Sequence, residues 1–386
     1  MLGFFNLKFN MIMNEKIYIL KQDNYNYDEI FKAVEKIFNF YGGVGNFVKP
    51  GETVLLKTNL VACHDVERRI TTDPNVVKAV AEILINHGAK PFIADSPGID
   101  NFNRTAQKAG IKKIADELNI KCIELVDPVN LNITSSNADY KNIQVSRSVI
   151  EADKIISLAK MKTHGQMLLT LGVKNLFGCV PGRLKSGWHY NVGLNRERFA
   201  ALLLDIYLNV KPVFTIVDGV IGMDGDGPTS GDPYNFNILA GACDALKLDF
   251  WLCKFMGAKF EEYPLYNAAL KKNLPECNLN PEDLAGDLDQ NFKFENVNIP
   301  ETRSMRLLPK IPFIEKLMTS KPVHIPEKCI GCGRCEEMCA AGALKHHNKK
   351  LTFDYSKCIR CYCCHEMCPV KAIEFKQSWL VKLLSR

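Results

Sequence analysis

The segments CIGCGRCEEMCAAGAL at 329–344 and CIRCYCCHEMCPVKAI at 358–373 match each other at a constant offset of 29 residues. Both contain four cysteines in the spacing C-x2-C-x2-C-x3-C, with a Glu-Met pair before the fourth cysteine. Self-similarity of this kind indicates an internal duplication, so we expect the two copies to fold alike.

Cysteines at this spacing are typical ligands of 4Fe–4S clusters. Three thiolates two residues apart surround one face of a cubane, and we expect the fourth cysteine to start a helix that points to the other cubane. A zinc site needs only four tetrahedral ligands and no third cysteine at the same short step. We therefore expect two 4Fe–4S clusters, one held by Cys329, Cys332, Cys335 and Cys368 and the other by Cys339, Cys358, Cys361 and Cys364.

Residues 322–376 resemble the bacterial-type two-cluster ferredoxin family, although Ala340 stands where the second copy has Pro369. The resemblance implies single-electron transfer. We expect the extra Cys363 to be a small buried residue against a cluster. His346 and His347 are predicted to lie in a solvated hairpin between the two copies.

Cysteine usage and charge indicate the compartment and the partner. Nine of the fifteen cysteines fall between 329 and 368, on a long chain without a signal peptide, which favours metal ligation in a reducing cytoplasm over disulfides. We expect the remaining six, Cys63, Cys122, Cys179, Cys243, Cys253 and Cys277, to be core residues. Residues 301–386 hold 16 Lys and Arg against 8 Asp and Glu. A basic electron-transfer module should attract an acidic partner such as a ferredoxin or flavodoxin, and without a recognition motif nucleic acid is not expected.

The chain divides by composition into five parts. Residues 1–12 are predicted to be a disordered or non-native extension, with translation starting at Met13. Residues 13–300 read as one domain, 301–321 as a proline-containing linker and 322–376 as the ferredoxin domain. The tail 377–386 is basic and amphipathic, so it packs on the surface or touches a membrane peripherally. No run of about 20 apolar residues exists, so no transmembrane segment is expected.

Residues 13–300 predict an α/β domain. Apolar, β-branched runs at 16–20, 53–58, 91–95, 154–159 and 213–219 are typical of strands. One helix should begin after Asp73-Pro74 and stop at Gly88, and another covers 196–210 before Pro212. This alternation favours βαβ units and a mainly parallel sheet.

Polar and glycine-rich motifs follow several of these strands. Ligands in α/β sheets bind outside the carboxyl ends of the strands, where such loops converge. From these loops we selected four candidate binding residues, Asn59, Ser96, Gly98 and Gly227. The aspartates at 224, 226 and 232 do not follow the calcium-loop pattern, so a solvated acidic loop is favoured there.

The chain resembles the domain of unknown function 362 family in five motifs. These are KTN at 57–59, DSPG at 95–98, KTH at 162–164, GVKN at 172–175 and GDGP at 225–228. Members are often fused to ferredoxin modules, and their activity is open. A weaker resemblance, to nickel-pincer lactate racemases, rests on His164, Lys174, Pro181-Gly182 and His189. It implies a polar pocket with a reactive lysine, a first histidine in acid/base work and a second that binds nickel. His64 is the one early candidate for the racemases' other acid/base histidine.

Three functions follow as hypotheses. In the first, the clusters relay single electrons to a small molecule or further cofactor in the α/β domain, where Lys57, His164, Lys174 and His189 anchor an anionic ligand or move protons. In the second, the chain is a non-catalytic electron carrier. In the third, it is a metallocofactor enzyme related to the racemases, with a lysine-tethered cofactor or nickel.

Overall fold

A computed structural model of the chain describes residues 15–98, 100–182, 184–193, 195–300 and 320–376. The predicted extension 1–12, the tail 377–386 and all but the last two residues of the predicted linker lie outside these ranges. No helix within the described ranges is long and apolar enough to cross a membrane.

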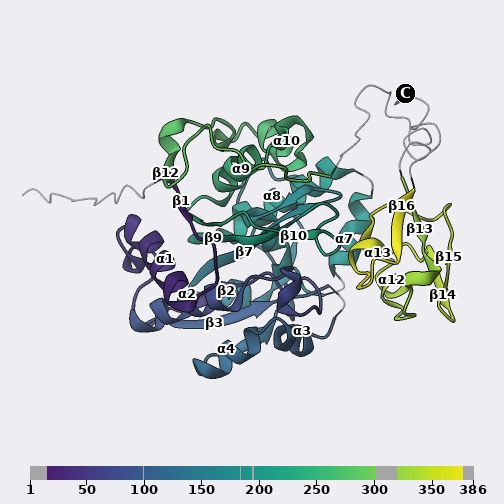
Figure 1. The fold of residues 1–386 in the computed structure, drawn as a ribbon, viewed down its shortest axis with the longest axis horizontal. Helices are drawn as coiled ribbons and strands as arrows, with labels where there is room; N and C mark the ends of the chain where they lie inside the picture. Colours follow the sequence, from purple (N-terminus) through teal and green to yellow (C-terminus); the bar gives the residue numbers. More distant parts are fainter. Residues whose placement is uncertain (1–14, 99, 183, 194, 301–319, 377–386) are drawn as a thin grey trace, which may run out of the picture.

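One large sheet organises the α/β domain (Figure 1). Five neighbouring strands run parallel, and two antiparallel pairings through β11 attach the remaining edge. The sheet is therefore mainly parallel, as predicted. Its order is β12 (Leu284–Gly286), β1 (Ile17–Lys21), β11 (Ile238–Ala242), β9 (Phe214–Asp224), β7 (Lys154–His164), β2 (Thr53–Lys57), β3 (Lys90–Asp95) and β4 (Cys122–Glu124), with β10 (Asp232–Tyr234) on β9 and β8 (Leu168–Thr170) on β7.

Helices cover both faces of this sheet. Because successive side chains of a strand point to opposite faces, Ile156 and Leu158 of β7 enter one core while Ile155 and Ala159 enter the other. The buried residues of α1 to α4 belong to one of these cores, and those of α8, α9 and α10 belong to the other, at the top of the view in Figure 1. The helices are α1 (Tyr27–Phe40), α2 (Pro74–Asn86), α3 (Phe102–Lys108), α4 (Ile111–Glu117), α8 (Arg196–Val210), α9 (Ala245–Phe255) and α10 (Pro264–Lys271).

The two predicted helices form where local signals place them. Asp73 caps α2 by accepting a hydrogen bond from the Asn75 amide, and Gly88, at φ +86°, follows its end. Helix α8 covers 196–210 as predicted, and the Asn195 side chain caps it. Shorter elements complete the domain, namely β5 (Pro128–Asn130), β6 (Gln144–Ser146), α5 (Arg147–Glu151), α6 (Gly172–Asn175) and α7 (Leu184–Val192).

The C-terminal module contains two copies of one structural unit. Helix α12 (Arg334–Glu337) and helix α13 (Cys363–Glu366) occupy the same place in the two copies. Strand β13 (Lys321–His324) pairs with β16 (Ile373–Lys376), and the predicted hairpin forms from β14 (Leu344–His347) and β15 (Lys350–Phe353). The expectation that each fourth cysteine starts a helix is wrong, because each helix ends before it. The sulfurs of Cys339 and Cys368 instead accept backbone N–H groups four residues later, at 3.2 and 3.1 Å.

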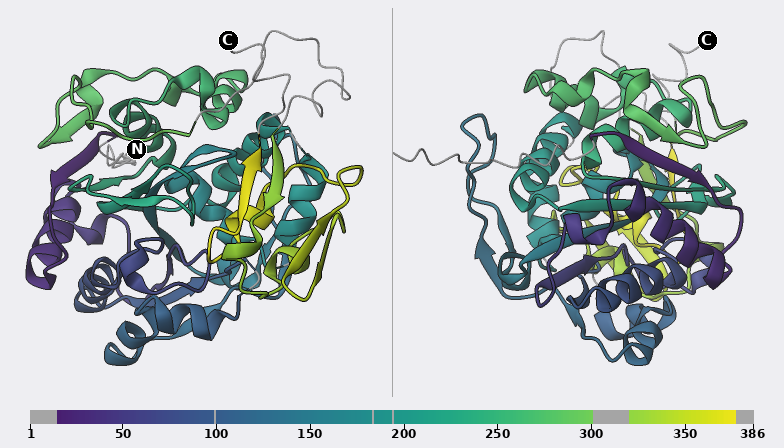
Figure 2. Two further views of the ribbon diagram at one scale, coloured as in Figure 1. Left: turned by 45° about the vertical axis from the view of Figure 1, so that its right-hand side comes forward. Right: turned by 90° about the vertical axis from the view of Figure 1, so that its left-hand side faces the viewer.

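The module packs against the edge of the α/β domain at the carboxyl ends of the parallel strands (Figures 1 and 2). The Glu-Met pair repeated in both copies explains this contact. Met338 and Met367 are both buried, and they pack together with Val61 and Ala62 from the loop after β2. An ion pair of 2.9 Å between Arg334 and Asp100 lies at the same boundary.

Candidate functional site

Three sequence-distant motifs meet beyond the carboxyl ends of β2 and β7. The Asn59 amide donates to Asn175 Oδ1 at 3.1 Å and accepts from Lys162 Nζ at 2.7 Å. Asn175 in turn donates to the backbone oxygen of Lys57 at 3.1 Å. Buried polar groups need partners, so each motif requires the other two. The loops converge as the sequence predicted.

Lys57 lies fully inside the domain, in a buried ion pair. Its Nζ is 2.6 Å from Asp95 Oδ1, and it donates to the Thr58 carbonyl oxygen at 2.6 Å. A Cβ on Gly178 would come within 2.4 Å of that carboxylate and 2.5 Å of that ammonium. The pair is therefore covered by backbone, and Lys57 holds two motif loops together instead of lining an open pocket.

Ser96 accepts hydrogen bonds from a second buried lysine, Lys185, which is not among the predicted site residues. Lys185 Nζ donates to the Ser96 carbonyl and hydroxyl oxygens at 2.6 and 2.8 Å and to the Pro97 carbonyl oxygen at 3.2 Å. Burial lowers the pKa of Lys185 to about 7. Ser96 is thus a structural acceptor between the DSPG loop and α7.

The two glycines among the predicted binding residues permit close packing. A Cβ on Gly227 would lie 2.1 Å from the Thr163 carbonyl oxygen, so the GDGP loop rests directly on the end of β7. A Cβ on Gly98 would meet Met367 Sδ at 3.2 Å, which places this residue under the ferredoxin module. Both are needed for the approach of neighbouring backbone or side chains.

Lys174 is held at the start of a short helix. The Asp249 carboxylate accepts the amides of Gly172 and Val173 at 2.8 and 3.0 Å, which fixes α6 and the direction of its lysine. Burial lowers the pKa of Lys174, while the nearby Glu366 carboxylate and Cys363 thiol raise it. Both neighbours come from the ferredoxin module.

His164 ends β7 with its side chain 1% exposed. Its Nδ1 accepts two backbone N–H groups, from Gln166 at 3.1 Å and Met167 at 3.2 Å. Burial, followed by the proximity of Lys174, His189, Lys162 and Arg196, holds the pKa of His164 well below its usual value. A neutral ring that accepts at Nδ1 carries its proton on Nε2.

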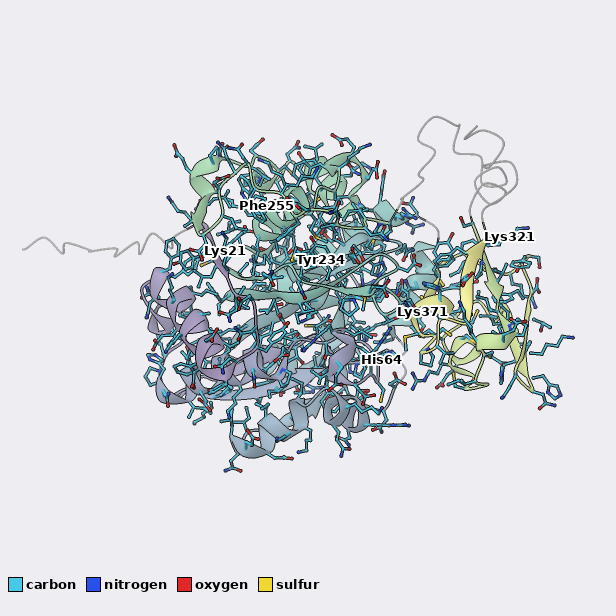
Figure 3. All side chains as sticks on the ribbon, in the orientation of Figure 1. Lys21, His64, Tyr234, Phe255, Lys321 and Lys371 are labelled. Atoms are coloured by element: carbon cyan, nitrogen blue, oxygen red, sulfur yellow. The ribbon has the colours of Figure 1, made fainter. Side chains whose placement is uncertain are left out.

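His189 lies next to this group in α7. Its ring packs edge-on against Phe177 and tilted against Phe199, with centroids 5.7 and 4.7 Å away. Burial, Lys174 and Lys185 lower its pKa to about 3, so the ring is neutral. His64 lies elsewhere, in the loop that faces the module (Figure 3), where burial and Arg68 lower its pKa to about 4.

A carboxylate from the ferredoxin module completes the cluster. Glu366 Oε1 is 3.4 Å from His164 Nε2, and its side chain is 17% exposed. The Thr229 hydroxyl donates to the backbone oxygen of Glu366, which anchors α13 to the GDGP loop. Glu366 is not among the site residues predicted from the sequence, although the repeat gave a signal: Glu366 stands in the same position as Glu337, which is exposed.

The cysteines gather as the duplication implies. Cys329, Cys332, Cys335 and Cys368 line one cavity. In the second set, Cys339 lies near Cys358. Burial is the main cause that raises the pKa of Cys358, and the Cys339 thiol raises it further. In each set, thiols of one copy meet the fourth cysteine of the other, and a set of four thiols suits an iron–sulfur cluster.

Cys363 is buried beside Met338 and Met367, as expected. His347 is exposed, but the prediction of a solvated His346 is wrong, because its side chain lines the cavity of the first cysteine set. Of the six predicted core cysteines, Cys63, Cys179, Cys253 and Cys277 are buried, whereas Cys122 and Cys243 are partly exposed.

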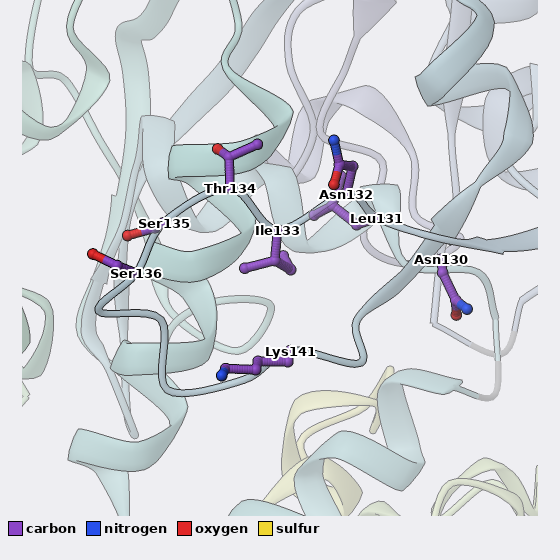
Figure 4. A pocket seen from close by; sticks show the side chains of 8 residues that line it. All are labelled: Asn130, Leu131, Asn132, Ile133, Thr134, Ser135, Ser136 and Lys141. Carbon is purple, nitrogen blue, oxygen red and sulfur yellow. The ribbon is translucent and has the colours of Figure 1, made fainter.

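In the acidic loop, Asp232, itself exposed, is 3.5 Å from Lys371 Nζ of the module. A further cavity lies away from this site, within the segment that joins β5 to β6. Residues 130–136 and Lys141 line it, so one stretch of chain frames it (Figure 4). No motif residue and no cysteine is among its lining residues. The candidate site is therefore the buried cluster between β7, α6, α7 and α13.

Comparison with known proteins agrees with both parts of the chain. Residues 321–372 match the 4Fe-4S dicluster domain. The thylakoid-associated protein of Synechocystis is 34% identical over 238 residues, which is 62% of this chain and 73% of that protein. Two solved structures align with lower identity. A protein from Thermotoga maritima has a TM-score of 0.39 at 14% identity, over 61% of this chain and 60% of that one. The lactate racemase apoprotein of Thermoanaerobacterium thermosaccharolyticum has a TM-score of 0.41 at 12% identity, over 62% and 56%.

The model of the domain of unknown function (DUF362) matches residues 54–254, about half of the chain. This range includes β2, β7 and α6, which carry the motifs of the candidate site. The chain belongs to the DUF362 family and carries an iron–sulfur, ferredoxin-type module at its C-terminal side.

Proposed function

We propose that this protein is an oxidoreductase in which 4Fe–4S clusters relay single electrons to a small molecule bound beside His164 and Lys174. One observation carries the proposal: α13 contains Cys364, a proposed cluster ligand, and two residues later presents Glu366 to His164 at 3.4 Å. A module that served only as a carrier would have no need to complete a buried polar cluster in another domain.

The proposed ligands are the two sets of four cysteines predicted from the sequence, and each set holds one cluster. Cys361, of the second set, packs with Val61 and Ala62 at the domain boundary, whereas Cys332 of the first set is exposed. Electrons therefore enter at the first cluster and leave from the second, which is nearer the candidate site. The basic charge of this region supports an acidic electron-transfer partner.

The protein's own residues divide the remaining tasks. Lys174 attracts an anion, and His164 donates a hydrogen bond from Nε2. His189 and its aromatic neighbours exclude water from the far side. Bound clusters supply one electron each, so the two together match a two-electron reduction of the small molecule.

For the location we propose the reducing cytoplasm, because none of the fifteen cysteines, all of which lie in the described ranges, forms a disulfide. A relative named as thylakoid-associated supports peripheral membrane contact as a second location. Neither location changes the proposed chemistry.

The test uses anaerobically purified full-length protein. The clusters are reduced with dithionite, the excess is removed, and the small-molecule fraction of a cell extract is added while the cluster absorbance is followed. We expect reoxidation in the wild type and a loss of at least tenfold in rate for Lys174→Met. Lys113→Met is the matched control, since its side chain is 80% exposed. Equal reoxidation rates in wild type and Lys174→Met would refute the role of this site.

A further inference from the structure

The cavity that contains the first cysteine set has two side-chain N–H donors in its lining. Arg334 and His346 border it together with the four cysteines of the set, and its other lining residues are apolar or glycine. No described residue that lines it carries a side-chain oxygen. Among the side chains of this cavity, the sulfurs are therefore the acceptors that a donor can reach.

Strand β14 holds the His346 ring beside the loop that carries these cysteines. Successive side chains of a strand alternate, so His346 faces inward whereas His347, the next residue, is exposed. The backbone amide of His346 donates to Glu336 Oε2 at 2.7 Å. A Cβ on Gly331, the residue before Cys332, would lie 3.8 Å from His346 Nε2. The imidazole therefore has a fixed place against the ligand loop.

His346 Nε2 has no partner within the described ranges. The atom is buried and forms no hydrogen bond there. A buried polar atom without a partner is unfavourable, so we expect this nitrogen to meet a group that the cavity receives from outside the protein. A 4Fe–4S cluster held by the four thiolates supplies sulfur acceptors at this place. Beside anionic sulfur the imidazole carries a proton on Nε2, because a nitrogen lone pair would be repelled.

Arg334, the second donor of the lining, also has a task at the domain boundary. Its Nη2 is 2.9 Å from Asp100 Oδ1, while its Nη1 is buried without a partner among the described residues. Replacing Arg334 would therefore disturb the boundary as well as the cavity. His346 belongs to the hairpin at the outer end of the module (Figure 1), so its effect can be measured separately.

The second copy provides an internal comparison. At the offset of 29 residues, Phe375 corresponds to His346. The Phe375 ring packs against Tyr362 and His365, with centroids 4.5 and 4.3 Å away. The structural unit therefore accepts a phenylalanine at this position, and the first copy alone has an N–H donor there.

We propose that His346 donates a hydrogen bond from Nε2–H to a sulfur of the first cluster and thereby raises the reduction potential of that cluster. Reduction adds one negative charge, and an N–H donor stabilises the more negative form. Cys332 of the same set is exposed, so the effect acts at the end where we propose that electrons enter. The inference rests on the first cluster of the proposed function and does not depend on the small molecule.

The test is a redox titration of anaerobically purified holoprotein, followed by EPR of the reduced clusters. His346→Phe, which copies the residue of the second unit, should lower one midpoint potential and leave the other unchanged. We expect about a tenfold loss in the reduction equilibrium constant, which corresponds to about 59 mV for one electron. The matched control is His347→Phe, because this neighbour is exposed and should leave both midpoints unchanged. Unchanged midpoints in His346→Phe, or an equal shift in His347→Phe, would overturn the proposal.

A second measurement does not require that His346→Phe keeps its clusters. Pulsed EPR of reduced protein with ¹⁵N-labelled histidine detects a histidine nitrogen that is hydrogen-bonded to a cluster. We expect such a coupling in the wild type and in His347→Phe. His346→Gln should lose this coupling but keep an N–H donor, so its midpoint should lie closer to that of the wild type than to that of His346→Phe. A wild type without any histidine coupling would overturn the contact.

This inference and the proposed function fail separately. Protein without iron and sulfide would refute the clusters and the proposed function together. Intact clusters whose potentials do not respond to His346→Phe would refute the inference alone. The expected shift, in protein whose reduced clusters no cell extract reoxidises, would support the role of His346 and refute the oxidoreductase.

Discussion

Replacing Lys57 by methionine separates a structural role from a catalytic one. The side chains of Lys57 and Asp95 are 1% and 4% exposed, and their charged atoms are 2.6 Å apart. Removing the ammonium leaves a buried carboxylate that accepts hydrogen bonds from the backbone amides of Leu60 and Ser96, both at 2.7 Å. Breaking one side of a buried pair costs about 3–5 kcal/mol. This is a large part of the about 5–15 kcal/mol that stabilises a folded domain.

The assay is urea unfolding of oxidised holoprotein, followed by the fluorescence of Trp251, which is fully buried in α9. Lys57→Met should lower the midpoint strongly, and Lys57→Met with Asp95→Asn should recover part of the loss because no buried charge remains. Lys113→Met, whose ammonium is 3.8 Å from Glu117 in an exposed pair, should change the unfolding free energy by less than about 1 kcal/mol.

Two results would contradict this reasoning. A Lys57→Met variant as stable as the wild type would show that the pair does not hold the motif loops. A double variant no more stable than the single one would show that the stranded charge is not the cause.

Three further predictions concern pH, the domain boundary and the metal content. Burial lowers the pKa of Lys185 from 10.5 to about 7, so the unfolded state binds more protons between these values. The contribution of Lys185 to stability should therefore rise as pH increases from about 7 to 10.5, and it should be level below about 7. Lys185→Met should show a flatter profile in urea unfolding at several pH values, whereas equal slopes would refute the assignment. Gly98→Leu should push Met367 and α13 outward and slow cluster reoxidation at least tenfold. Gly187→Leu, at a position open to solvent, is the control and should leave the rate unchanged. Unchanged rates in both variants would contradict the packing of the ferredoxin module on Gly98. Anaerobic protein should contain about eight iron and eight sulfide per chain, and zinc in their place would exclude the clusters.

Local signals explain what could be predicted. The cysteine spacing within each copy predicts the cluster ligands, because three thiolates at short steps suit one cubane. The bounds of α2 and α8 follow from Asp73-Pro74, Gly88 and Asn195, which act on neighbouring backbone groups only. Alternation of strands and helices was also enough to place the polar loops at one edge of the sheet.

Pairing in three dimensions decided the rest. Residue type alone could not distinguish the three lysines. Lys57 forms an ion pair with Asp95, and Lys185 donates to Ser96. For Lys174 the described residues offer no such acceptor. The proton on His164 Nε2 depends on two amides that turn back onto Nδ1 after the strand ends.

The cysteine repeat shows this division most clearly. The sequence by itself determined two equivalent copies, each with a Glu-Met pair before its fourth cysteine. The tertiary structure alone decided that Glu366 faces His164 while Glu337 is exposed. The physical reason is that docking buries one copy's helix against β7 and the GDGP loop, and burial depends on contacts between residues far apart in the chain.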